Sequence, residues 1–257
     1  WTYSYNSHGY TMAPWTQGIY RVDLLIAGQK IASEYFDVYN ADCSGDLSFV
    51  DAGKVNDLRQ AVESARNSGD DSQYQDALLQ LAIALHNRAG QCYINGNVDA
   101  AVQDFTEAIQ FLPDFPMAYY HRGLALMDLR RTKDALSDFN SAINYKQEAD
   151  YYAARGRAQF EIENDSEALE DLNRAIDLDS KQAEFYHDRG IVDYYLSDDK
   201  NALQDLNQAA AMYQSQNEQE KYQVVASDID ILEGRKQGYL KLYDRGRSFT
   251  MAKIKSD

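Results

Sequence analysis

Oxygen-bearing side chains cluster in one short stretch between Asn40 and Asp51. They fall at its first, third, fifth, ninth and twelfth places, with Gly45 at the sixth place and Leu47 at the eighth. Ca²⁺ takes about six to eight oxygen ligands, and a glycine at the sixth place permits the sharp bend that wraps the chain around the ion. The stretch therefore predicts a calcium site. Its ligands would be Asn40, Asp42, Ser44, Asp46, Ser48 and Asp51.

This spacing resembles the calcium loop of EF-hand and dockerin domains, with departures. Asn40 stands where the family has Asp, Asp51 is shorter than the usual Glu, and no helix is predicted before the loop. We favour the alternative, a linker rich in Asp, Ser and Gly in which Asp51 or Ser48 caps the helix that starts at Ala52. Calcium is the one cofactor that the sequence suggests, and under the linker interpretation no cofactor is expected.

The chain has two cysteines, Cys43 and Cys92, and no CxxC motif, so a zinc or redox site of that spacing is excluded. Either both are free thiols or, in a secreted protein, they form a disulfide. Asn164-Asp165-Ser166 is the one N-glycosylation sequon and lies in a predicted turn. No P-loop, GxSxG, HExxH or Cys–His constellation is present, so no catalytic residue is predicted and the protein is expected not to be an enzyme.

The elements that carry these residues are set by a repeat between Leu85 and Ala210. Four copies of one pattern follow each other: Arg with Gly or Ala, then Ala, then Asp with Phe or Leu, then Ala. The copies are offset by 34, 33 and 34 residues, and their arginines are Arg88, Arg122, Arg155 and Arg189. A fixed period in this range predicts stacked helical hairpins, because one hairpin cannot bury its apolar face without a neighbour.

Within the second copy, Tyr119, Gly123 and Leu126 share one face of a first helix, and Ala135 and Phe139 share one face of a second. The pattern resembles the tetratricopeptide repeat over about half of the chain. Gln159 and Asp193 are departures, at places where the family usually has an apolar residue. The resemblance implies a mainly α fold, a right-handed superhelix of helical hairpins with a concave groove.

The resemblance also implies which side chains line the groove and that a protein or peptide binds there. These residues are His86, Tyr93, Met117, Tyr120, Leu124, Met127, Arg157, Phe160, His187, Ile191 and Tyr194. The alternative is that part of this stripe is core between helices. Arg157 is the one cation in the set, so a ligand held by its terminal carboxylate is not expected. His86, His121 and His187 lie in different repeats, and we expect them to be too far apart to share a metal.

Each repeat also has an Asp sixteen residues after its Arg. Because residues that recur once per repeat serve the repeat itself, we predict intramolecular ion pairs here and no ligand site. The pairs are Arg88/Asp104, Arg122/Asp138, Arg155/Asp171 and Arg189/Asp205.

The sequence predicts strands near both ends of the chain. Alternating residues on both sides of Ala27-Gly28-Gln29 predict a β-hairpin, which resembles the closing hairpin of immunoglobulin-like β-sandwiches. Residues 239–254 give a second hairpin signal. The predicted order is a β segment (1–38), a linker or calcium-like loop (39–51), an introductory helical hairpin (52–84), four repeats (85–215), a capping helix (216–235) and a basic tail (236–257).

The net charge of −16 argues against nucleic acid and anionic membrane surfaces as partners. No apolar run is long enough to span a bilayer, so no membrane insertion is expected. The chain starts at Trp1, which we interpret as loss of a leader or as part of a longer protein, and an extracellular, cell-surface or periplasmic location is favoured over the cytoplasm. The predicted function is a protein-interaction and assembly module. The alternative is an extracellular subunit that forms homo-oligomers or filaments through its strand-rich termini.

Overall fold

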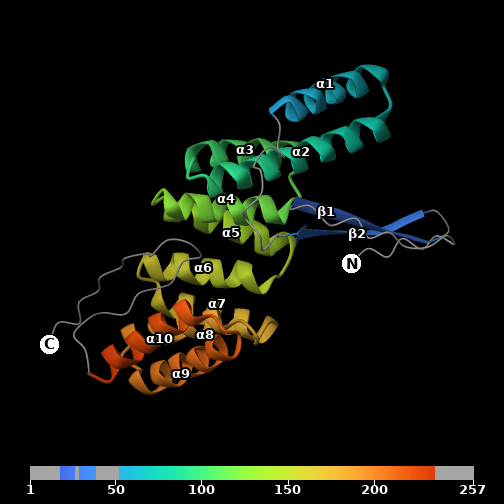
Figure 1. Cartoon of the computed structure of the whole chain (residues 1–257). Coiled ribbons are helices and arrows are strands. Elements are labelled where there is room, and N and C mark those ends of the chain that lie inside the picture. The colour runs from blue at the N-terminus through green and yellow to red at the C-terminus, as the bar shows by residue number, and fades with distance from the viewer. Residues whose placement is uncertain (1–17, 27–28, 39–51, 235–257) are drawn as a thin grey trace.

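The computed structural model describes residues 18–26, 29–38 and 52–234. Within these ranges a two-stranded hairpin precedes ten helices, which stack one after another as antiparallel neighbours (Figure 1). The bounds are β1 Gly18–Ile26, β2 Gln29–Val38, α1 Ala52–Ser68, α2 Asp71–Ile94, α3 Val98–Phe111, α4 Pro116–Asp128, α5 Thr132–Tyr145, α6 Ala149–Glu161, α7 Asp165–Leu178, α8 Ala183–Tyr195, α9 Asp199–Ser215 and α10 Gln219–Leu232. The expected mainly α class is confirmed.

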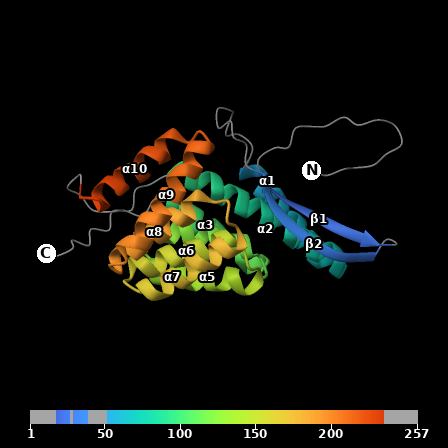
Figure 2. The same ribbon diagram turned by 90° about the horizontal axis from the view of Figure 1, so that it is seen from below.

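The helices alternate between two roles. The first helices are α2, α4, α6 and α8, and each packs closely on the second helix that follows it, respectively α3, α5, α7 and α9. At the two ends of the array, α1 packs on the N-terminal half of the long helix α2, and α10 packs on α9 (Figure 2). Their apolar residues join the core clusters of the adjacent repeats, so both ends of the array are covered by a helix.

Each first helix ends in the same turn, although only one of the four turns contains glycine at the critical position. The backbone φ is positive at Gly96, Arg130, Glu163 and Ser197. After α6, the amide of Glu163 donates to the carbonyl of Phe160 at 3.0 Å, and the amide of the next residue reaches one carbonyl further back at 2.9 Å. This left-handed turn satisfies carbonyls that a helix end leaves open, and it directs the chain into the second helix.

Small residues set the distance between the two helices of a hairpin. A Cβ on Gly156 would lie 3.1 Å from the carbonyl oxygen of Ala168, and Gly190 makes the same close approach in the next repeat. A Cβ on Gly123 would lie 2.5 Å from Cε1 of Phe139, whose ring is fully buried. The predicted environment of these glycines, a crossing of two closely packed helices, is confirmed.

The first helices lie on the inner side of the array. Helix α2 contacts α4, α4 contacts α6 and α6 contacts α8, whereas the second helices make fewer such contacts with one another. Stacked hairpins in which one set of helices approaches more closely than the other bend toward the closer set. The exposed surface of the first helices is therefore the surface that an extended partner can follow along several repeats.

Strands β1 and β2 pair antiparallel, with Gly18 opposite Val38 and a register irregularity at Leu24/Leu25. They form a two-stranded sheet, and the hairpin projects from the stack of helices beside α2 (Figures 1 and 2). Membership in an immunoglobulin-like sandwich stays a prediction. The calcium-like loop, Cys43 and the predicted hairpin at 239–254 lie outside the described residues.

Candidate interaction surface

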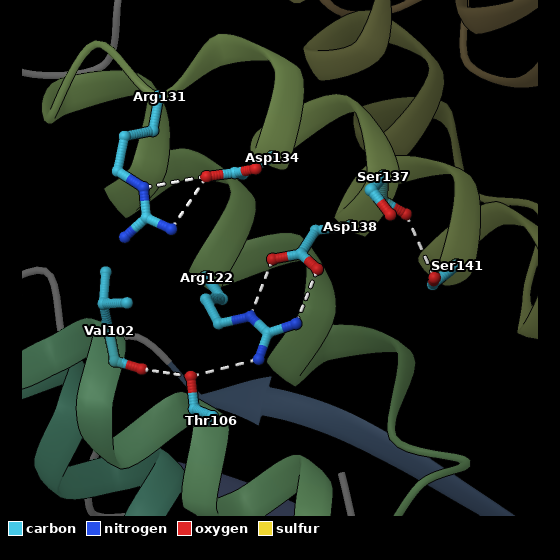
Figure 3. Close-up of polar contacts among 8 residues, drawn as sticks. All are labelled: Val102, Thr106, Arg122, Arg131, Asp134, Ser137, Asp138 and Ser141. Atoms are coloured by element: carbon cyan, nitrogen blue, oxygen red, sulfur yellow. Dashed lines mark hydrogen bonds and ion pairs between the residues drawn. The ribbon is translucent and has the colours of Figure 1, made fainter.

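In the second, third and fourth repeats one arginine joins three helices. Figure 3 shows the second repeat, in which Arg122 of α4 donates to both carboxylate oxygens of Asp138 on α5 at 2.7 Å. The same guanidinium donates to Oγ1 of Thr106 on α3, in the preceding repeat, at 3.0 Å. Thr106 donates in turn to the carbonyl of Val102 at 2.6 Å. A planar guanidinium with several fixed donors suits this bidentate geometry better than an ammonium group does.

All four predicted pairs form, at 2.6 Å or 2.7 Å between the charged groups. In the third and fourth repeats the contact to the preceding hairpin is made to an asparagine, Asn140 for Arg155 and Asn173 for Arg189, at 2.7 Å in both cases. Hydrogen bonds to Asp171 raise the pKa of Arg155 above its ordinary value. The four predicted ion pairs are therefore confirmed, and Arg122, Arg155 and Arg189 also connect adjacent hairpins.

The residues predicted to line the groove divide into two groups. Six are buried and belong to the packing between helices; they are His86, Tyr120, Met127, Phe160, His187 and Ile191. The other five are partly exposed on the first helices, and we call them the inner face; they are Tyr93, Met117, Leu124, Arg157 and Tyr194. The core interpretation therefore holds for the first group, and partner binding by the second group stays a prediction.

The inner face carries one arginine, and that arginine is already paired. Arg157 of α6 contacts Glu184 at 2.5 Å and Asp188 at 2.6 Å, both on α8. Burial raises the pKa of the Asp188 carboxyl to about 6, although the charge of Arg157 acts to lower it. Oδ1 of Asp188 and the hydroxyl of Tyr213 are both buried without a hydrogen-bond partner in the structure.

The histidine prediction needs correction. His86 and His121 lie in different repeats, yet Nε2 of His86 is 2.8 Å from Nδ1 of His121, because α2 and α4 touch on the inner side of the array. His187 sits elsewhere, on α8, with Nε2 2.8 Å from Asp228 on α10. Among the described residues, no group of three or more His, Cys, Asp or Glu could hold a metal ion.

The remaining predicted sites are placed as follows. Asn164 is exposed in the turn between α6 and α7, where a glycan would meet no neighbouring helix, and its glycosylation stays a prediction. Cys92 is partly buried on α2, and burial raises the pKa of its thiol. Its predicted partner lies outside the described residues. None of the described helices is both long and apolar enough to cross a membrane.

Sequence reasoning missed the polar group formed by Glu184, Asp188, Tyr213 and Asp228 around Arg157 and His187. One signal was available. Glu184 and Asp188 are four residues apart on a first helix and therefore share a face, and Arg157 occupies the neighbouring first helix. Pairing carboxylates with a cation across successive first helices, as well as within a hairpin, would have found the contact.

Comparison with known proteins agrees with this architecture. Residues 149–182, which include α6 and α7, match the family model for the tetratricopeptide repeat. No curated protein matches the chain significantly. Among solved structures, MamA (41-end) from Desulfovibrio magneticus RS-1 is 20% identical with a TM-score of 0.51, covering 63% of this chain and 97% of that one.

A tetratricopeptide repeat protein from Parabacteroides merdae ATCC 43184 is 14% identical with a TM-score of 0.53, covering 71% of this chain and 75% of that one. At such identities the likeness concerns the fold alone. The chain thus contains a tetratricopeptide repeat at residues 149–182, within a mainly α array whose fold is similar to that of tetratricopeptide repeat proteins.

Proposed function

We propose that this protein is a non-enzymatic interaction module that binds a protein or an extended peptide along its inner face. The observation that carries the proposal is a set of partly exposed, mostly apolar side chains on three of the four first helices: Tyr93 on α2, Met117 and Leu124 on α4, and Tyr194 on α8. Aromatic residues and methionine supply large, adaptable contact area, which is the composition of binding surfaces that accept extended segments.

The charges on the inner face restrict the kind of ligand that can bind there. Arg157 is neutralised by Glu184 and Asp188, so it is not available to hold a terminal carboxylate. The protein as a whole has a net charge of −16, which slows the approach of acidic partners and favours neutral or basic ones. The ligand that fits is an extended segment with apolar anchors and few acidic residues.

A selection with matched variants tests this proposal. A peptide library would be screened against the immobilised full chain, and the enriched peptides would be measured against Leu124→Asp, on the inner face, and Leu178→Asp, on α7. Leu178 is 40% exposed but belongs to a second helix. We expect Leu124→Asp to weaken binding at least about tenfold, the effect of placing a charge in an apolar contact, and Leu178→Asp to leave it unchanged. Peptides equally sensitive to both variants, or no enrichment, would refute the proposal.

A second candidate is a self-assembling extracellular subunit, and the β1–β2 hairpin favours it. Two strands alone are marginally stable in water, and both edges of this sheet lack a third strand among the described residues. A neighbouring copy that adds a strand would complete the sheet and produce a filament when the contacts do not close. Sedimentation of the full chain over a wide concentration range decides the matter, because a protein that stays monomeric throughout is not a filament subunit.

A further inference from the structure

The contact between His86 and His121 joins two imidazole rings on successive first helices. Nε2 of His86 on α2 lies 2.8 Å from Nδ1 of His121 on α4. His86 is 5% exposed, and the rings of Phe105 and Phe115 pack against it with centroids 5.1 Å and 5.2 Å away. The contact is therefore short, polar and enclosed by aromatic side chains.

A hydrogen bond between two imidazole nitrogens exists only while one nitrogen carries a proton and the other offers a lone pair. At neutral pH one ring donates and the other accepts. When both rings are protonated, both nitrogens are donors, so the bond is lost and two positive charges face each other. Because His86 is buried among aromatic rings, a charge on it is poorly solvated, which makes the doubly protonated contact costly.

Among the described residues, no carboxylate acts on His86 to offset that cost. From α4 it meets His121 and the backbone of Met117, from its own helix Asn87, and from α3 the ring of Phe105. Burial lowers the pKa of His86 well below its ordinary value, and the charge on His121 lowers it further. Beyond the contact, the ring of His121 packs against Tyr120 and Phe105.

We propose that the His86–His121 contact is an acid-sensitive joint, which holds the first two repeats together on their inner side at neutral pH and separates when the protein is acidified. The opening itself depends only on the geometry of the contact. Its consequence for binding rests on the proposed function: Tyr93 on α2 and Met117 on α4 belong to the inner face on either side of this joint, so separating the helices changes the surface that a partner meets.

The other buried histidine provides an internal contrast. His187 on α8 lies 2.8 Å from Asp228 on α10. Protonation of His187 would convert this contact into a charge-assisted hydrogen bond, which is stronger than a neutral one. Acid should therefore loosen the joint between α2 and α4 and leave the joint between α8 and α10 closed.

Amide hydrogen exchange of the full chain at pH 7.5, 6.5, 5.5 and 4.5, corrected for the intrinsic exchange rate, tests the proposal. A histidine with an ordinary pKa near 6.5 in the open state and a much lower one in the closed state makes opening about tenfold more favourable at pH 5.5 and about 100-fold at pH 4.5. This loss of protection should appear in the peptides that span α2 and α4, and those that span α8 and α10 should keep theirs.

Two variants identify the group responsible. In His86→Gln the side-chain amide reaches about as far as Nε2 does but does not titrate, so α2 and α4 should no longer lose exchange protection in acid. His86→Asn, which does not titrate either, serves if His86→Gln fails to fold by circular dichroism. His187→Gln, the matched control, should leave the response of α2 and α4 unchanged.

Equal protection of α2 and α4 at all four pH values would overturn the proposal, as would an acid response that survives in the folded non-titrating variant. Because exchange is measured without a ligand, its outcome is independent of partner binding. If α2 and α4 lose protection in acid but the screen selects no peptide, the acid-sensitive joint is supported and the proposed function is refuted. If peptides bind but α2 and α4 keep their protection in acid, the proposed function is supported and the acid-sensitive joint is refuted.

Discussion

Two glycines on first helices should respond in opposite directions to the same substitution. Gly123 on α4 faces Phe139, and an added Cβ would lie 2.5 Å from Cε1 and 2.9 Å from Cδ1 and Cζ of that ring. Gly90 on α2 has no atom within 4 Å of the equivalent point. Gly123→Ala therefore requires the packing to shift, and Gly90→Ala does not.

The magnitudes follow from two opposing effects. Alanine stabilises a helix interior by about 0.5–1 kcal/mol relative to glycine, because the unfolded chain loses less conformational freedom. Carbon atoms in contact lie about 3.5–4.0 Å apart, so the fully buried ring of Phe139 must move by about 1 Å, and such overpacking costs about 1–3 kcal/mol. We expect Gly90→Ala to stabilise by about 0.5–1 kcal/mol and Gly123→Ala to destabilise by about 0.5–2 kcal/mol.

The first repeat shows that the hairpin can accommodate a methyl group when its helices are spaced for it. Ala89 occupies the place that corresponds to Gly123, and Phe105 corresponds to Phe139; both are buried. The cost of Gly123→Ala thus comes from the spacing of α4 and α5 around a ring, and removing ring atoms should reduce it. In a Phe139→Leu background, Gly123→Ala should cost less than in the wild type.

Urea unfolding followed by circular dichroism measures the free energy of unfolding of the wild type, Gly90→Ala, Gly123→Ala, Phe139→Leu and the Gly123→Ala/Phe139→Leu double variant. Because repeat arrays do not always unfold in one step, amide exchange in α4 and α5 should be measured alongside. The reasoning is refuted if Gly123→Ala stabilises as much as Gly90→Ala, or if its cost is the same with leucine at position 139. Either result would mean that the ring does not determine the helix spacing.

Three further predictions follow from the same structure. Arg155→Lys, which loses the bidentate contact to Asp171 and the bond to Asn140, should reduce the free energy of unfolding by about 1–2 kcal/mol in urea titrations, whereas Arg174→Lys, at an exposed arginine, should have almost no effect. Glu163→Gly should stabilise by about 0.5–1 kcal/mol, because φ is +66° there and only glycine adopts this conformation without strain; an unchanged thermal midpoint would contradict this. Burial raises the pKa of Asp188 to about 6, so the ionised carboxylate destabilises the folded protein above that pH, and this cost decreases as the pH falls toward 4. The wild type should therefore gain stability between pH 7 and 5 relative to Asp188→Asn. Parallel profiles of stability against pH for the two proteins would rule this out.

The sequence predicts best those features that recur. The arginine–aspartate pairs were predictable because four copies at one spacing leave a single geometry that serves all of them, and every pair forms. The helix-crossing glycines were predictable for the same reason. The turn after each first helix also recurs in position, although its residue is Gly96 in one repeat and Arg130, Glu163 and Ser197 in the others, so the period carries information that residue type alone does not.

What could not be predicted are contacts that occur once. His86 and His121 are thirty-five residues apart, so they belong to different repeats, and only the closeness of α2 and α4 brings their nitrogens together. The closeness of α4 and α6 likewise brings the buried ring of Tyr120 against Tyr151, tilted and with ring centroids 4.9 Å apart, so that Tyr120 does not face a groove. Sequence periodicity gives the face of a helix but not its distance from the next first helix, and that distance decides whether a residue is core or surface.

Contacts that recur in the repeats and contacts that occur once both hold the array together, at different places. Between a second helix and the next hairpin the contact is nearly constant: an arginine with Thr106, Asn140 or Asn173. On the inner side each joint is chemically different. They are His86–His121, Tyr120–Tyr151, Arg157 with Asp188 and Glu184, and His187–Asp228.

A constant contact on one side and varied contacts on the other have a mechanical consequence. If adjacent hairpins rotate about the constant arginine contact, the inner joint between them must open, so we expect the strength of each inner joint to affect how easily that part of the array bends. A ring pair, a buried ion pair and a histidine pair respond differently to pH and salt, because only the last two change with charge. The inner face is therefore divided into segments whose flexibility can be changed separately, by a single substitution in each joint.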